Sequence, residues 1–126
     1  MIAYLDTYVA VWLAEGRTRK LSTRSLALVE RSETLLAPMA LLELEYMHEL
    51  RRSTLRAQDI LIKLKHEIGL RVCDLPFADV VTAACDEGWT RDPFDRMIVA
   101  QAKTNGLAPL ISADKEIAKH YPRTVW

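Results

Sequence analysis

Glycine and cysteine are scarce in this chain of 126 residues, which has four glycines and two cysteines. The glycines stand singly, so the sequence has no glycine-rich loop of the kind that cradles phosphates in kinases and dinucleotide-binding enzymes. Cys73 and Cys85 are too few for a disulfide scaffold and lack the spacing of a zinc site. They are typical of small core residues in a reducing compartment, so we expect a cytoplasmic protein.

Long hydrophobic runs are also absent, because no apolar stretch approaches the ~20 residues that a membrane-spanning helix needs. The N-terminus does not combine a basic segment with an apolar one, so no signal peptide and no membrane association are predicted. Half of the residues are nevertheless hydrophobic. This composition and length predict one folded domain over residues 1–126.

Net charge is absent as well, since 17 basic residues balance 17 acidic ones. Neutrality alone argues against a protein that grips nucleic acid by a large basic surface. The charges are unevenly spread, however, because arginines and lysines gather at 17–24 and 51–65 and glutamates gather at 30–49. The basic stretches are open to two interpretations, as ordinary solvated charge or as phosphate-binding groups.

Short apolar runs alternate with helical patterns along the whole chain. Strands are predicted at 2–5, 35–37, 71–73, 109–112 and 124–126. Helices are predicted at 8–14, 22–31, 38–52, 55–67, 76–85, 93–105 and 114–119. Strands separated by helices indicate an α/β fold with a central parallel sheet of four to five short strands, covered by helices. Such sheets place ligands at the carboxyl ends of their strands.

Two acids come directly after predicted strands. Asp6 follows the first strand, and Asp114 follows the strand that ends near residue 112. Both positions lie at the edge of the sheet where a ligand is expected. Either residue also suits a simple cap on the helix that comes next.

Glu43 lies on the apolar side of its predicted helix. Helical spacing places one set of residues together on a face expected to be buried: Met39, Leu42, Glu43, Tyr46, Met47 and Leu50. A carboxylate is rarely buried without a partner, so Glu43 is either a metal ligand or the partner of an arginine at the core margin. Glu45 competes for the same role, but helical phase favours Glu43.

Asp92 and Asp95 flank Pro93 at the start of the strongest predicted helix. Pro93 suits the first helical position, which makes Asp92 the expected N-cap and puts Asp95 on the apolar stripe. If all these acids converge, their repulsion requires a hard cation such as Mg²⁺ or Mn²⁺, which takes oxygen ligands. A Mg²⁺ site made of carboxylates is suited to phosphoryl chemistry.

Four segments together resemble a PIN domain, in particular the VapC-type toxins of bacterial toxin–antitoxin pairs. They are Asp6-Thr7, Leu42-Glu43-Leu44, Arg91-Asp92-Pro93-Phe94-Asp95-Arg96 and Ser112-Ala113-Asp114. The resemblance covers essentially the whole chain. It implies a PIN-like three-layer α/β/α fold and an endoribonuclease that depends on Mg²⁺, with Mn²⁺ as a substitute. It also implies that water activated by the metal hydrolyses RNA, and that the chain forms a homodimer bound to a VapB-like antitoxin.

The resemblance also assigns roles to single residues. Asp6, Glu43, Asp95 and Asp114 match the catalytic carboxylates that bind the metal, with Asp6 and Asp95 the most direct ligands. Asp92 matches a further acid of this branch, which caps a helix and contacts the water shell of the metal.

Two other functions fit the sequence less well. A catalytically silent PIN-like module that binds an antitoxin-like partner agrees with the small size and neutral charge. A Mg²⁺-dependent phosphatase is least favoured, because Asp6 lacks the second acid two residues later that such enzymes carry.

Overall fold

The five predicted strands form one parallel sheet in the computed structural model, which describes residues 1–126. The order across the sheet is β3-β2-β1-β4-β5. The strands are β1 (Ile2–Leu5), β2 (Glu33–Leu36), β3 (Arg71–Val72), β4 (Leu110–Ile111) and β5 (Thr124–Val125). The predicted α/β class and the parallel sheet of four to five short strands are therefore confirmed.

Seven α-helices connect the strands. They are α1 (Thr7–Ala14), α2 (Thr23–Arg31), α3 (Pro38–Glu49), α4 (Ala57–Ile68), α5 (Phe77–Ala84), α6 (Pro93–Thr104) and α7 (Lys115–His120). Their ends lie within three residues of the predicted ones, and a 3₁₀ turn at Thr18–Lys20 was not predicted. None of these helices is long and apolar enough to cross a membrane.

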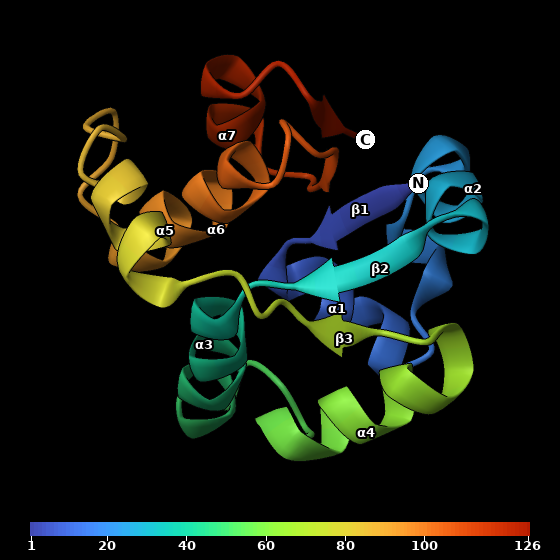
Figure 1. Ribbon diagram of the computed structural model, residues 1–126. Helices are drawn as coiled ribbons and strands as arrows, with labels where there is room; N and C mark the ends of the chain where they lie inside the picture. The colour runs from blue at the N-terminus through green and yellow to red at the C-terminus, as the bar shows by residue number, and fades with distance from the viewer.

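The direction of the strands decides where a ligand can approach. β1 is the middle strand and pairs in parallel with β2 and β4, with Tyr4 opposite Leu35 and Leu5 opposite Ile111. The arrowheads of β1 and β2 both point toward the side on which α3 and α6 lie (Figure 1). The residue that follows β1 is Asp6, so this acid stands at the carboxyl edge of the sheet.

The main core contains 29 buried residues around the sheet. The Tyr4 hydroxyl donates to Cys73 Sγ at 3.0 Å and accepts from Asn105 Nδ2 at 2.8 Å, so its polar group is satisfied inside the protein. The predicted core position of Cys73 is confirmed. The same prediction for Cys85 is wrong: this residue is exposed because it follows the short helix α5, which buries Val80 and Ala84 instead.

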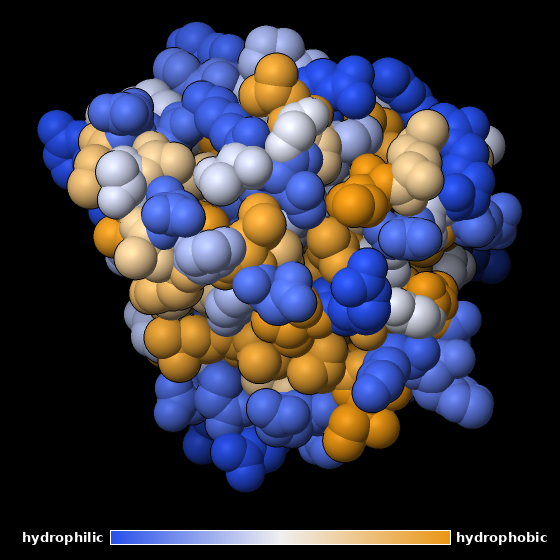
Figure 2. Space-filling view, in the orientation of Figure 1, coloured by the Kyte–Doolittle hydropathy of each residue, from blue (hydrophilic) through white to orange (hydrophobic).

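The predicted buried face of α3 is also wrong. The helix buries Ala40, Leu44 and Met47, whereas Leu42 and Tyr46 are 56% and 49% exposed. Since α3 contacts α1, α4 and α6, its orientation follows three partners rather than its apolar stripe. Hydrophobic surface consequently remains visible over the region of α3 and the space between α3 and α4 (Figure 2).

Candidate metal centre

Asp6 is anchored by two hydrogen bonds at the carboxyl end of β1. Its Oδ1 accepts from the Thr7 backbone N–H at 2.8 Å, which makes it the N-cap of α1. Its Oδ2 accepts from the Ser112 hydroxyl at 2.5 Å, just after β4. The side chain therefore joins two neighbouring strand ends and is only partly exposed.

Glu43 reaches the same region from α3. Its Oε1 accepts a short hydrogen bond from the hydroxyl of Thr7, the residue after Asp6. Glu43 is half-buried and pairs with no arginine, so the alternative of an ion pair at the core margin is not found. Glu45 instead binds Arg56 at 2.6 Å and the Ala57 backbone N–H at 3.1 Å, which fixes the start of α4.

Asp92 and Asp95 belong to the first turn of α6. Asp92 Oδ1 accepts from the backbone N–H groups of Phe94 at 2.8 Å and Asp95 at 3.2 Å, as predicted for an N-cap. Asp92 is exposed and Asp95 is partly buried. The cap therefore uses the carboxylate of Asp92 and leaves that of Asp95 without a hydrogen-bond donor from the protein.

Asp114 caps α7 in the same way. Its Oδ1 accepts from the backbone N–H groups of Glu116 at 2.8 Å and Ile117 at 3.2 Å. Its own backbone N–H donates to the Ser112 hydroxyl, which itself donates to Asp6. Ser112 thus ties Asp114 to Asp6 through one hydroxyl group.

The pKa values of Asp6, Glu43 and Asp95 are raised by burial and by the charges of the neighbouring acids. Burial, followed by the charges of Asp92, Asp6, Asp114 and Glu43, raises the pKa of Asp95 to about 7. Burial raises the pKa of Glu43 to about 7 against the hydrogen bond from Thr7, and Asp6 and Asp92 add to the shift. The pKa of Asp6 is also raised by burial, with Asp114 and Asp92 contributing. The five carboxylates therefore form one electrostatic unit.

The chemistry of this donor set fits a hard divalent cation, which takes carboxylate oxygens and offsets their repulsion. As the side chains stand, no three Asp, Glu, His or Cys groups form a ready-made ligand set. None of the four surface cavities is lined by any of the five acids. The five acids therefore stand at an open edge of the sheet and not inside a cavity, with Asp92 and Asp114 exposed and the other three partly buried.

Two positioning residues, Thr7 and Ser112, were not identified from the sequence. Both are 1% exposed, and their hydroxyl groups hold Glu43 and Asp6 respectively. The only signal for them was their place next to acids at strand ends, in Asp6-Thr7 and Ser112-Ala113-Asp114. A buried hydroxyl requires a hydrogen-bond partner, and here the partner is a carboxylate.

Solved structures of similar fold include VapBC2 from Rickettsia felis bound to a DNA fragment from its promoter, with a TM-score of 0.61 and 19% identity. The match covers 99% of this chain and 96% of that one. A toxin–antitoxin complex from Klebsiella pneumoniae has a TM-score of 0.67 and 16% identity, covering 98% and 96%. VapBC-1 from nontypeable Haemophilus influenzae has a TM-score of 0.59 and 19% identity, covering 98% and 92%.

These three similarities show a common fold only, because the sequence identities are low. No curated protein matches the chain. The family model of the PIN domain, in contrast, matches residues 3–121, which include all five acids. The resemblance noted in the sequence is thereby confirmed: the chain belongs to the PIN domain family.

Proposed function

We propose that this protein is a Mg²⁺-dependent endoribonuclease, with Mn²⁺ as a substitute, and the toxin of a VapBC-type pair. The observation that carries the proposal is the group of five carboxylates at the carboxyl edge of the sheet, whose charges, with burial, raise the pKa values of Asp6, Glu43 and Asp95. Membership of the PIN domain family, whose members are generally nucleases, supports the same activity. The similar folds of three toxin–antitoxin complexes support the toxin role.

Each acid has a separate task in this proposal. Asp6 and Asp95 are the most direct ligands, since both are partly buried and the charges of neighbouring acids raise the pKa of each. Glu43 and Asp114 complete the site, and Asp92 borders it while capping α6. A divalent cation would supply Lewis-acid activation of water and stabilise charge on the leaving oxygen.

The hydroxyl groups of Thr7 and Ser112 orient the carboxylates of Glu43 and Asp6. Thr7 donates to Oε1 of Glu43 and leaves its Oε2 without a hydrogen bond, whereas both oxygens of Asp6 accept one bond each, from the Thr7 N–H and the Ser112 hydroxyl. An acidic group of this kind repels a phosphodiester until its charge is offset. The chain therefore requires the cation both to bind and to cleave a phosphodiester at this site.

Cleavage of RNA by the purified chain tests the proposal. We expect Mg²⁺ to support cleavage, and EDTA or Asp6→Asn to abolish it. Asp59→Asn is the matched control, because Asp59 is an exposed acid of α4 outside the group. Cleavage that persists in EDTA and in Asp6→Asn would contradict the metal mechanism, and a folded chain that never cleaves would favour the silent module.

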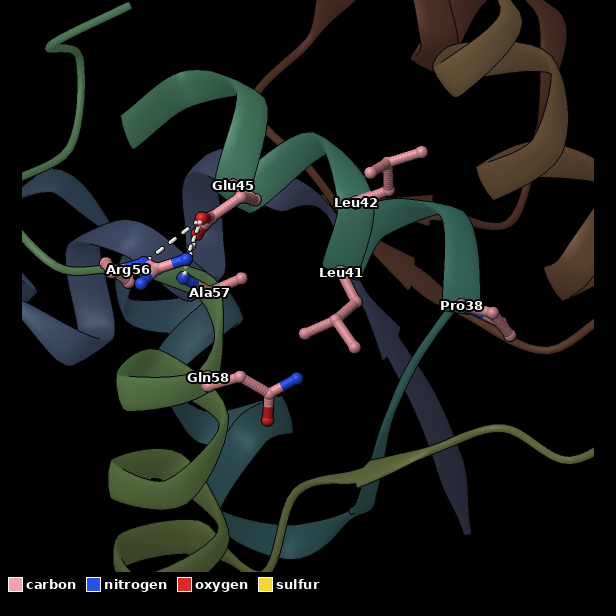
Figure 3. A pocket seen from close by; sticks show the side chains of 7 residues that line it. All are labelled: Pro38, Leu41, Leu42, Glu45, Arg56, Ala57 and Gln58. Atoms are coloured by element: carbon pink, nitrogen blue, oxygen red, sulfur yellow. Dashed lines mark hydrogen bonds and ion pairs between the residues drawn. The ribbon is translucent and has the colours of Figure 1, made fainter. Parts of the chain in front are cut away.

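An antitoxin requires a docking surface, and the cavity between α3 and α4 is suited to this role. This cavity of about 380 Å³ is lined by Pro38, Leu41, Leu42, Glu45, Arg56, Ala57 and Gln58. Leu41 and Leu42 lie on its α3 side, and the Glu45–Arg56 ion pair stands at one end (Figure 3). We propose that apolar side chains of a small VapB-like partner insert here.

Leu42→Asp tests this surface, because Leu42 is 56% exposed and its replacement leaves the core intact. Co-purification with the product of the neighbouring small open reading frame should fall strongly. Ile62→Asp is the control, since Ile62 is 66% exposed on α4 and does not line the cavity. Equal co-purification of the two variants with the partner would show that the partner binds outside this cavity.

Light scattering of the complex tests the proposed homodimer.

A further inference from the structure

A second cavity, of about 410 Å³, lies where α1 and α3 end. It is lined by Glu15, Arg17, Arg51, Arg52, Ser53 and Thr54, and none of these side chains is hydrophobic. Three guanidinium groups face one carboxylate, which leaves an excess of two positive charges. Such a lining disfavours an apolar segment and favours an anion.

The one carboxylate of this cavity is already engaged. Glu15 Oε2 accepts from the Thr54 backbone N–H at 3.2 Å and from its hydroxyl at 2.9 Å, while Oε1 lies 3.5 Å from Arg17. Arg51 and Arg52 are exposed and form no ion pair within the chain. Their charges are therefore free to bind a ligand.

Arg51 occupies a backbone conformation that favours glycine. Its φ is 60°, and its N–H donates to the His48 carbonyl, while the Arg52 N–H donates to the Met47 carbonyl. This pattern is a Schellman motif, in which the left-handed position usually carries glycine. Glycine would serve helix capping alone, and arginine at this position adds a positive charge beside the cavity.

The helices α1 and α3 connect the cavity with two of the acids: Asp6 lies at the start of α1 and Glu43 in the middle of α3, and the cavity lies where both helices end. Asp6 precedes α1 and Glu15 follows it nine residues later, which separates them by about 13.5 Å along the axis. Glu43 and Arg51 are eight residues apart on α3 and the turn after it, which corresponds to about 12 Å. Because α1 and α3 are in contact, they hold the cavity and these two acids at a fixed separation, which is no longer than a few nucleotides of a strand.

We propose that Arg17, Arg51 and Arg52 bind backbone phosphates of the RNA a few nucleotides from the bond that is cleaved. This inference rests on the proposed ribonuclease function. Arginine suits the site because its planar fork binds phosphate oxygens in pairs. Phosphate contacts of this kind hold and orient a strand without reading its sequence.

Binding of a fluorescent single-stranded RNA of mixed sequence tests the proposal, with Asp6→Asn as the background that prevents cleavage. Adding Arg51→Gln and Arg52→Gln should weaken binding roughly tenfold or more. The slope of log K against log salt should become shallower by about 0.7 for each phosphate that the protein no longer neutralises. Arg51→Gly alone should weaken binding without lowering the melting temperature, since glycine suits this φ.

The matched control is Arg31→Gln with Arg123→Gln, which removes the same charge from a separate cavity at the start of β1 and β5, lined also by Met1 and Thr124. Equal effects of the two pairs would overturn the inference and indicate diffuse attraction. Unchanged RNA binding with impaired antitoxin binding would also overturn it, in favour of an acidic peptide. Cleavage by the wild-type chain in Mg²⁺ is measured in parallel, so a failure of the ribonuclease proposal is recognised separately.

Discussion

Glu43 and Asp95 are acids whose pKa values of about 7 place their ionisation near neutral pH. Unfolded, both groups lose their protons near pH 4. Between these limits the folded chain binds more protons than the unfolded chain, so its stability falls as pH rises from about 4 to 7. A cation at the site would reverse this loss by offsetting the repulsion.

We therefore expect Asp95→Asn to stabilise the metal-free protein at pH 8. The gain should be on the order of 1–2 kcal/mol, because the substitution removes one charge from a partly buried group of acids. At pH 5 the gain should be small, since Asp95 is already protonated there. Urea denaturation in EDTA at the two pH values measures the difference.

Asp59→Asn should show no such change with pH, because Asp59 is exposed on α4. A loss of stability at pH 8 in Asp95→Asn would show that the Asp95 carboxylate stabilises the metal-free fold. That result would contradict the electrostatic interpretation of the five acids.

The sequence predicted the caps and the grouping of the acids, because strand ends and helix starts are local patterns. Asp92 and Asp114 each follow such a pattern and are N-caps in the structure. The bonds of Thr7 to Glu43 and of Ser112 to Asp6 span 36 and 106 residues along the chain. No local pattern reports a contact of that range, so these two partners required the fold.

Hydrophobic periodicity alone does not decide which face of α3 is buried. The apolar positions of this helix allow more than one buried face, and contacts with α1, α4 and α6 select Ala40, Leu44 and Met47. Glu43 lies beside this buried face and is half-buried, and its role as a metal ligand stays a prediction. The exposed Leu42 and Tyr46 remain as surface for a partner.

A pair of leucines on α3 tests this orientation. Leu44 is fully buried, so Leu44→Ala should lower the free energy of unfolding by about 2–5 kcal/mol. Leu42 is 56% exposed, so Leu42→Ala should change it by less than about 0.5 kcal/mol. Chemical denaturation of the isolated chain measures both. A larger loss for Leu42→Ala would show that the helix is turned the other way.

The whole molecule separates charges that cancel in the composition. The five acids lie at the carboxyl edge of the sheet, and the cavity with Arg17, Arg51 and Arg52 lies about one helix length away. The sequence revealed this segregation along the chain, whereas its arrangement in space depends on the parallel packing of β1 and β2 and on the contact of α1 with α3. Zero net charge is thus compatible with an RNA partner.

Calorimetric titration with Mn²⁺ tests most directly whether the five acids act as one cation site. We expect the wild-type chain and Asp59→Asn to bind Mn²⁺ with similar affinity and measurable heat. Asp6→Asn and Asp95→Asn should each lose most of this binding while remaining folded. Absence of binding to the wild-type chain, or unchanged binding to Asp6→Asn and Asp95→Asn, would show that the five acids do not form one cation site.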